Sequence, residues 1–325
     1  LKILADKAGV KLTTRSVIRG DKEFQADSKT ILYERNNLAA ALYHKLLLEH
    51  AKASSARAYL HDRGISDKTI IDFQIGYAPD SWDFLIRFME SKKYKRADLF
   101  KAGMLVANNR GDYYDRFRGR IIFPINNVMG NCVAFTSRVL VDDGKQAKYV
   151  NSADSPIYHK GKVLYGLDKA KMSIREKSIA IVVEGNMDVI ACHQAGFKNV
   201  VASSGTAVTE DQIRTLSRYA SDVALAFDSD QAGEIAMKRA VTTALKSDIS
   251  VKIIEIPSGF KDPDEAIKSD KKIWQKAVES ARPAVEVWID RLTRGQNIND
   301  IGERRKTAKE ILPIIKSISS EMEKE

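Results

Sequence analysis

Acidic residues occur in pairs after three apolar segments in the second half of the chain. The pairs are Glu184 and Asp188 in VVEGNMDVI, Asp228 and Asp230 in LAFDSDQAG, and Asp262 and Asp264 in FKDPDEAI. Residues two apart in an extended chain face the same side, so the carboxylates of the second pair can point to one spot. Pro263 biases Asp262 toward an extended conformation, which favours the same arrangement in the third pair. We therefore expect the carboxylates to gather in one place.

Neighbouring carboxylates repel one another, and a divalent cation would remove that repulsion. A site made only of oxygen ligands suits Mg²⁺ or Mn²⁺ rather than zinc. Two such ions can activate a 3′-hydroxyl and stabilise a leaving pyrophosphate. The pattern predicts a metal-dependent phosphoryl-transfer site.

Each pair also has a purely structural interpretation. Asp188 in the first turn of a helix would complement the helix dipole. A DxD pair is common in any sequence, and DPDE alone is typical of a turn that starts a helix. The placement of all three pairs at the ends of strands in one sheet favours the chemical interpretation, because ligands of open parallel sheets bind beyond the carboxyl ends of the strands.

The predicted sheet comes from the region after Ser178, where apolar runs alternate with amphipathic segments. The apolar runs are SIAIVVEG, NVVASSG, DVALAFDSD and VKIIEIP. Continuous apolar strands separated by helices of about a dozen residues are typical of a doubly wound α/β sheet that is parallel and covered on both faces.

The rest of the chain divides around this sheet. Residues 28–103 carry helical apolar spacing and predict short helices, and from Met104 runs such as RIIFPI and NCVAFTSRVL predict a mixed β region. After Pro257 we expect helices at 270–281, 283–294 and 303–318. The predicted subdomains are 1–177 (helical, then mixed β, and basic), 178–282 (α/β) and 283–325 (a C-terminal helical bundle).

The net charge of +10 is concentrated in one third of the chain. Residues 91–177 hold 18 Lys and Arg against 8 Asp and Glu, while the remainder balances at 35 against 35. Such an excess favours polyanionic partners, because each neutralised phosphate releases counterions. A solvated basic face would give the same composition, so charge alone leaves nucleic acid as the favoured partner.

Cysteine content and hydropathy exclude several classes. Cys132 and Cys192 are the chain's two cysteines, in a predicted strand and a predicted helix with no CxxC, so we expect no zinc site. No apolar run approaches the roughly 20 residues that span a bilayer, and the first residues do not resemble a signal peptide. We expect no membrane contact and a cytoplasmic location. Because the chain begins with Leu1 and not Met, we expect it to be a fragment of a longer protein.

Several motifs together resemble one family. EGNMD at 184–188 with DSD at 228–230 resembles the Toprim signature, which primases share with topoisomerases, repair proteins and nucleases. The segments before it resemble the motifs of bacterial DnaG-type primases, in that family's order and spacing. They are DRFRGRIIFPI (115–125), AFTSRVL (134–140), KYVNS (148–152) and YHKGKVLYGL (158–167). The chain is thus similar to the RNA polymerase core of these primases, with a Toprim-type sheet.

The resemblance implies roles for individual residues. Glu184, Asp228 and Asp230 would be the main metal ligands, with Asp188, Asp262 and Asp264 completing the acidic site. The residues implied in binding nucleotide or template are Arg116, Arg118, Arg120, Arg138, Lys148, Tyr149, Asn151 and Lys160. Each cation could instead be a solvated surface group. Tyr149 could stack on a base or be a buried strand aromatic, and the buried interpretation is favoured.

The resemblance also implies an activity and partners. The chain would join ribonucleoside triphosphates into short RNA primers on single-stranded DNA, using Mg²⁺ or Mn²⁺, with two ions expected. Family members carry an N-terminal zinc-binding domain and a C-terminal domain that binds the replicative helicase, and neither is represented in this sequence. We expect the core to be a monomer. A Toprim nuclease or topoisomerase and a non-catalytic repair scaffold are the alternatives.

Some positions depart from the family pattern. Asn186 replaces an aromatic residue, Thr136 and Ser137 replace glycines, and Ser229 replaces a glycine between two aspartates. These changes leave every carboxylate and cation in place, so their expected effect is on local loop geometry.

Overall fold

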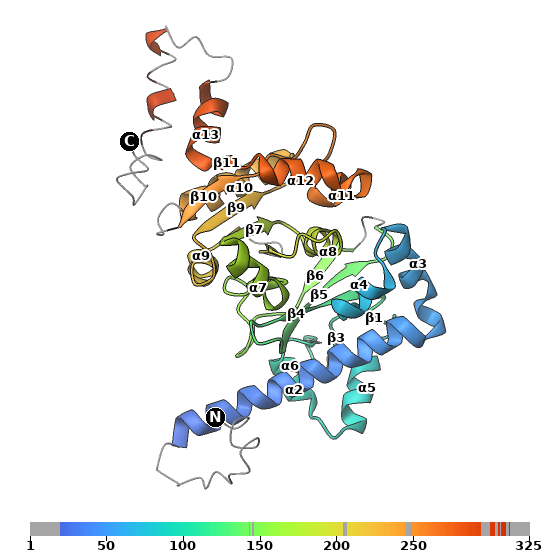
Figure 1. The fold of residues 1–325 in the computed structure, drawn as a ribbon. Coiled ribbons are helices and arrows are strands. Elements are labelled where there is room, and N and C mark those ends of the chain that lie inside the picture. The colour runs from blue at the N-terminus through green and yellow to red at the C-terminus, as the bar shows by residue number, and fades with distance from the viewer. Residues whose placement is uncertain are drawn as a thin grey trace, which may run out of the picture.

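The computed structural model describes residues 20–142, 144, 146–203, 207–244, 249–293 and 300–302, with residues 305, 307–309 and 312 nearer the end of the chain. Side chains at 20–28 and 232 are excepted. Figure 1 shows the order of elements along the chain: helices come first, then an antiparallel sheet, and then a second sheet covered by helices.

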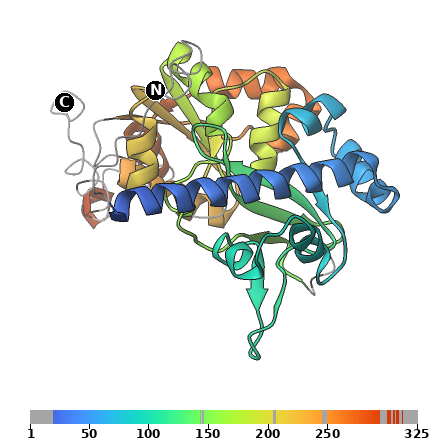
Figure 2. The same cartoon turned by 90° about the horizontal axis from the view of Figure 1, so that it is seen from below.

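A long helix packs against the antiparallel sheet in the first half of the chain. It is α2 (Gly20–Glu49), a single helix of 30 residues where the sequence predicted short helices. No proline or internal glycine interrupts it. Figure 2 shows α2 crossing beneath the antiparallel sheet. The helices that follow are η1 (Ala51–Ala53), α3 (Ser54–Asp62), α4 (Asp67–Asp72), α5 (Phe84–Ser91) and α6 (Arg96–Lys101).

The mixed β region predicted from Met104 is present, with one strand from an earlier segment. The sheet order is β1-β4-β5-β6, and every pairing is antiparallel. Its strands are β1 (Gly76–Ala78), β4 (Arg120–Asn126), β5 (Cys132–Val139) and β6 (Tyr149–Asn151). A two-stranded ribbon of β2 (Leu105–Ala107) and β3 (Tyr113–Asp115) lies beside it. The sequence predicted short helices over residues 28–103, so β1 was not expected. A Cβ there would lie 2.6 Å from Tyr43 Cβ, so glycine lets β1 approach α2.

The second sheet has the order β11-β10-β9-β7-β8. Its parallel strands are β7 (Ile179–Val183), β8 (Val200–Ala202), β9 (Asp222–Ala226) and β10 (Ser250–Ile253). The edge strand β11 (Arg282–Pro283) is antiparallel to β10, which the sequence did not predict. The connecting helices are α7 (Leu167–Lys177), α8 (Asn186–Gln194), α9 (Glu210–Leu216) and α10 (Gln231–Ala244).

Helices cover both faces of this sheet, as predicted for a doubly wound fold. Ala180 and Val182 of β7 belong to a core with residues of α7, α9 and α10. Ile181 and Val183, which alternate with them, belong to a second core with residues of α8.

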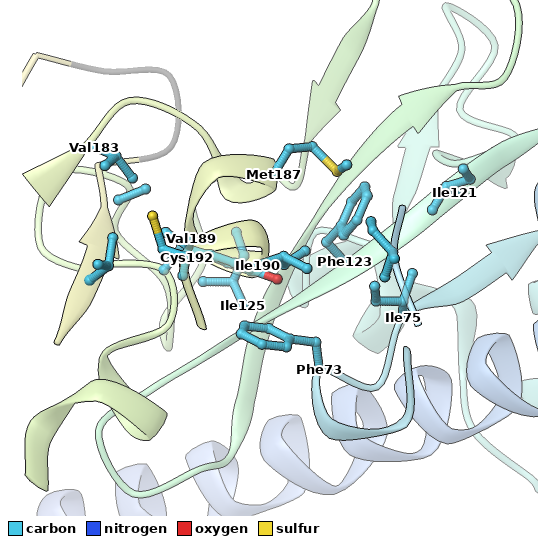
Figure 3. Packing of buried hydrophobic residues seen from close by; sticks show 14 of the residues in the cluster. Phe73, Ile75, Ile121, Phe123, Ile125, Val183, Met187, Val189, Ile190 and Cys192 are labelled. Carbon is cyan, nitrogen blue, oxygen red and sulfur yellow. The ribbon is translucent and has the colours of Figure 1, made fainter. Parts of the chain in front are cut away.

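The second core also contains residues of the antiparallel sheet. Figure 3 shows Met187 and Ile190 of α8 beside Phe123 of β4 and Phe73, while Val183 lies on the other side of α8. Helix α8 therefore joins the two sheets through one continuous hydrophobic core, and it carries Asp188 at its start.

The C-terminal helical bundle is not confirmed. Helices α11 (Pro263–Ser269), α12 (Lys271–Glu279) and α13 (Ala284–Thr293) are present, but α13 packs Ala284 and Val287 against the sheet core. The helix predicted at 303–318 falls largely outside the described residues, and the subdomain boundaries stay a prediction. Among the described residues, no helix combines the length and apolar character needed to cross a bilayer.

Candidate active site

The first two acidic pairs meet where β7 and β9 end. Glu184 directly follows β7, and its Oε1 accepts a hydrogen bond of 3.0 Å from the backbone N–H of Asp228. Asp188 lies in the first turn of α8, and its Oδ2 accepts a hydrogen bond of 3.1 Å from the N–H of Gly185. The sheet thus brings carboxylates from two neighbouring strand ends together, as the sequence predicted.

Asp228 and Asp230 do not follow the alternation of an extended strand, because β9 ends at Ala226. Asp230 directly precedes α10, and its Oδ1 accepts a hydrogen bond of 2.9 Å from the N–H of Gly233. Its Oδ2 lies 3.7 Å from Lys261 Nζ. Asp228 instead lines a cavity together with Glu184, Asp188 and Asp262.

The third pair divides between two roles. Asp262 caps α11 by accepting a hydrogen bond of 2.8 Å from the N–H of Glu265, and it lines the cavity. Asp264 is 3% exposed, and its Oδ2 lies 3.0 Å from Arg63 Nη2 and 2.6 Å from Lys268 Nζ. Two cations therefore already neutralise Asp264.

Four carboxylates that line the cavity have raised pKa values, because they are buried and lie close to one another. Burial, followed by the charges of Glu184 and Asp262, raises the pKa of Asp228 to about 7, although Lys261 opposes the shift. Burial and the charges of Asp262 and Asp228 hold the pKa of Asp188 well above its usual range. Burial is also the main cause of the raised pKa values of Glu184 and Asp262.

This surplus of negative charge fits a divalent cation held by oxygen ligands. Within the described part of the chain, no three acidic, His or Cys side chains are close enough to form a finished metal site.

The lining of this cavity also includes basic and aromatic side chains. The cavity, of about 420 Å³, is also lined by Arg63, Arg138, Lys148, Tyr149, Asn151 and Lys261. Four of these were predicted from the sequence. Tyr149 is 37% exposed, so the favoured interpretation as a buried strand aromatic is wrong. Its hydroxyl lies 3.3 Å from Arg138 Nη1, and the Arg138 guanidinium lies over the rings of Tyr59 and Tyr149.

The other predicted arginines line a separate cavity of about 510 Å³. Arg116 Nε donates to Gly103 O at 2.9 Å, and Arg120, which is 5% exposed, donates to Ala147 O at 2.9 Å. Both therefore hold backbone, and burial lowers their pKa values. The Arg118 guanidinium lies 4.0 Å from the centroid of the Trp82 ring. Lys160 lies in the loop before α7, where its N–H donates to Asp154, outside the lining of both cavities.

Sequence reasoning missed several residues that line these cavities, among them Lys261, Arg63 and Trp82. Lys261 stands directly before the third acidic pair, so a search for cations beside the carboxylates could have found it. Arg63 ends a helix far from any acidic motif, and Trp82 is an isolated aromatic in a helical region. Neither carries a local signal.

Hydrogen bonds accommodate two of the departures from the family pattern, Ser137 and Ser229. The buried Nδ2 of Asn186, in contrast, has no hydrogen-bond partner among the described residues. Ser137 is buried and donates to Val150 O at 3.0 Å. Ser229 donates to Phe260 O at 3.2 Å, and its N–H donates to Lys261 O at 3.0 Å, which ties the second acidic pair to the third. Asn186 is 4% exposed and, like Thr136, lines the cavity that contains the carboxylates.

A parallel sheet with these acidic strand ends defines a Toprim domain, and a Toprim-like family model matches residues 181–267. A second model, the N-terminal domain of the DNA primase catalytic core, matches residues 43–171. The DNA primase of Clostridium acetobutylicum is 40% identical over 321 residues, which cover 98% of this chain and 52% of that protein.

Solved structures agree with these matches. A DnaG primase catalytic domain bound to single-stranded DNA is 35% identical, with a TM-score of 0.81, and the match covers 92% of this chain and 96% of that chain. A DNA primase domain from Pseudomonas aeruginosa is 34% identical, with a TM-score of 0.82, and the match covers 90% of this chain and 92% of that one. The chain belongs to the DnaG primase family and corresponds to its catalytic core. It spans about half the length of the curated relatives it matches.

Proposed function

We propose that this chain is the catalytic core of a primase that makes short RNA primers on single-stranded DNA. The observation that carries this proposal is the single cavity that Glu184, Asp228 and Asp262 line together with Arg138 and Lys148. The carboxylates come from the part of the chain that the Toprim-like model matches, and the cations come from the part that the primase-core model matches. The 3′-hydroxyl of one ribonucleotide would attack the α-phosphate of the next, and pyrophosphate would leave. A nuclease, a topoisomerase and a repair scaffold are not favoured, because none of them explains the match over residues 43–171.

Glu184, Asp228 and Asp262 are the residues we propose to hold Mg²⁺ or Mn²⁺, with Asp230 as a further ligand. When bound, one or two such ions would supply charge neutralisation and activation of the attacking hydroxyl. Asp264 would act differently, because its pairing with Arg63 and Lys268 leaves it as an anchor for the cation at the cavity wall.

The chain's own cations would hold the triphosphate. Arg138 presents a planar guanidinium and Lys148 and Lys261 present point charges, and both kinds of group bind phosphate oxygens. Tyr149, exposed beside Arg138, would offer its ring to a base. The template would extend to the second cavity, where Trp82 and Arg118 form an exposed stack. We propose that the whole protein works in the bacterial cytoplasm with a replicative helicase as partner.

A primer-synthesis assay tests the proposed function. The chain would be incubated with single-stranded DNA, four ribonucleotides and Mg²⁺ or Mn²⁺. We expect Glu184→Gln to lose at least about 100-fold in rate, because it removes a charge from the reacting site. Glu176→Gln, an exposed carboxylate on α7, is the matched control and should retain the rate. DNA binding without synthesis would favour the scaffold, and relaxation of supercoiled plasmid would favour a topoisomerase.

Metal affinity should depend on pH through the titration of Asp228. Because the pKa of Asp228 is raised to about 7, the carboxyl is mostly protonated at pH 6 and an ion must displace its proton. Raising the pH from 6 to 8 should therefore tighten Mg²⁺ binding by about tenfold, with release of a proton on binding. Calorimetry in two buffers of different ionisation enthalpy measures both effects. An affinity that does not change with pH would contradict this assignment, and Asp228→Asn should flatten the profile.

A further inference from the structure

The exposed stack at the second cavity contains three side chains, which we call the stacking platform: Trp82, Tyr114 and Arg118. Trp82 is 63% exposed. The Arg118 guanidinium lies 4.0 Å from the Trp82 ring centroid and 5.3 Å from that of Tyr114, and the two rings meet edge to face at 5.2 Å. Trp82 belongs to the segment before α5, whereas the other two belong to the chain around β3. The stacking platform therefore depends on contacts that hold the segment before α5 against the segment around β3.

The start of α5 lacks the side-chain cap that its own sequence could supply. Asp83 is the N-cap residue, yet among the described residues its side chain accepts no hydrogen bond from the N–H groups of α5. It contacts Arg87 at 2.7 Å and accepts from Ser81 instead. The first N–H groups of a helix need an acceptor from elsewhere.

Asp115, at the end of β3, supplies that acceptor. Its side chain is buried, and its two carboxylate oxygens accept hydrogen bonds from Leu85 N at 2.6 Å and Ile86 N at 3.2 Å. These partners are 30 and 29 positions away in the sequence. Asp115 thus caps α5, the helix that follows Trp82, from a distant part of the sequence.

The backbone of Asp115 makes two further bonds to the stacking platform. Its N–H donates to Trp82 O at 2.8 Å, and its carbonyl oxygen accepts from Arg118 Nη1 at 2.5 Å. One buried residue therefore contacts the segment that carries Trp82, the helix that follows, and the Arg118 side chain. Burial raises the pKa of Asp115 to about 6, so the carboxylate is ionised at neutral pH, when its bonds to N–H groups are strongest.

We propose that Asp115 is a positioning residue for template binding: it holds Trp82 and Arg118 in place as a preformed surface on which a base of single-stranded DNA stacks. The proposal rests on the proposed function, because it takes single-stranded DNA as the ligand of the second cavity. A preformed surface loses less conformational freedom on binding, so loosening it should weaken binding while the reacting site stays intact.

Asp115→Asn tests the proposal. Asparagine keeps the shape and one acceptor but turns the second acceptor into a donor that faces an N–H group. We expect the Kd for a labelled single-stranded oligonucleotide and the KM for template to rise about five- to twentyfold, with kcat at saturating template unchanged. Asp112→Asn, an exposed residue just before β3, is the matched control. A fall in kcat with unchanged KM would overturn the positioning role.

Tryptophan fluorescence gives a readout that does not require DNA. Of the three tryptophans, Trp274 and Trp288 are 0% and 9% exposed, so quenching by iodide reports mainly on Trp82. We expect Asp115→Asn to change the quenching constant of the free protein. Unchanged quenching would overturn the proposal. Should Asp115→Ala fail to fold, the asparagine variant carries the test.

A double-mutant cycle with Trp82→Ala separates positioning from general destabilisation. If Asp115 acts through Trp82, Asp115→Asn should have little further effect on DNA binding once Trp82 is removed. Equal effects in both backgrounds would overturn the proposal. If the unaltered chain makes primers but Trp82→Ala binds DNA normally, this inference fails and the proposed function stands. If the unaltered chain makes no primers, the proposed function fails first.

Discussion

Asp228→Asn is expected to abolish primer synthesis and, at the same time, to raise the stability of the metal-free protein at neutral pH. The loss of synthesis follows from removing a proposed metal ligand, and the gain in stability follows from the burial of this carboxylate and the negative charges beside it. Glu184, Asp262 and Asp230 all raise its pKa, and burial raises it most. A proposed metal ligand whose ionised form is unfavourable in the folded state should cost stability when no ion is bound.

The sign and size of the stability effect follow from the shift of the pKa from 3.8 to about 7. The ionised group is disfavoured in the folded state, so the cost is absent below about pH 4, grows as the pH rises and is complete above about pH 7. A shift of this size corresponds to about 4 kcal/mol, and partial exposure with solvent screening reduces the expected gain for asparagine to about 1–2 kcal/mol.

Denaturant unfolding at pH 4 and pH 8, with and without Mg²⁺, measures this trade-off. The variant should be more stable than the unaltered chain at pH 8 without metal, and equal to it near pH 4. Excess Mg²⁺ should reduce or reverse the difference, because an ion that binds only the folded state stabilises it. A variant less stable than the parent at pH 8 without metal would show that Asp228 is held by favourable contacts and not opposed by its neighbours.

Gly233→Ala is expected to lose at least about 100-fold in the rate of primer synthesis, because misplacing reacting groups by about an ångström is costly. A Cβ at this position would lie 2.2 Å from the carbonyl oxygen of Asp228 and 2.9 Å from Oε1 of Glu184. The carbonyl belongs to the backbone, so it cannot rotate away as the end of a flexible side chain could. Two proposed metal ligands would therefore have to move.

The same substitution reverses an ordinary rule of helix stability. Ala is usually about 1 kcal/mol better than Gly inside a helix, but the clash should instead destabilise the protein by about 1–3 kcal/mol. Ile235→Ala is the matched control, since Ile235 lies on the same helix and is 49% exposed. Rate assays and thermal unfolding of both variants measure the effects. Full activity in Gly233→Ala would show that α10 can shift away from the carboxylates without loss.

The sheet and its acidic strand ends could be predicted because both are local properties of the sequence. Each apolar run of four to eight residues identifies a buried strand. A carboxylate directly after such a run, like Glu184, must lie beyond the carboxyl end of that strand. The charge excess after residue 91 also pointed to the part of the chain that supplies Arg138 and Lys148 to the cavity.

What could not be predicted depends on contacts between distant segments. Asp264 and Arg63 are 201 positions apart, and nothing near either residue indicates that they pair. Arg116 and Arg120 share a motif with Arg118, yet their hydrogen bonds hold backbone while Arg118 stacks on Trp82. A motif of alternating cations does not reveal which of them faces a ligand, because that depends on neighbours the motif does not contain. Similarly, the sequence predicted short helices in the region where α2 continues without a break over 30 residues.

The hydrophobic core that α8 shares with both sheets restricts how far the two sheets can move relative to each other. Swinging the basic half away from the acidic half would expose Phe123, Met187 and Ile190 to water, at a cost that grows by about 25 cal/mol for each Å² of apolar surface. We therefore expect the distance between the two sheets to stay the same throughout a catalytic cycle. Substrates should enter and leave through the open side of the cavity without separation of the sheets.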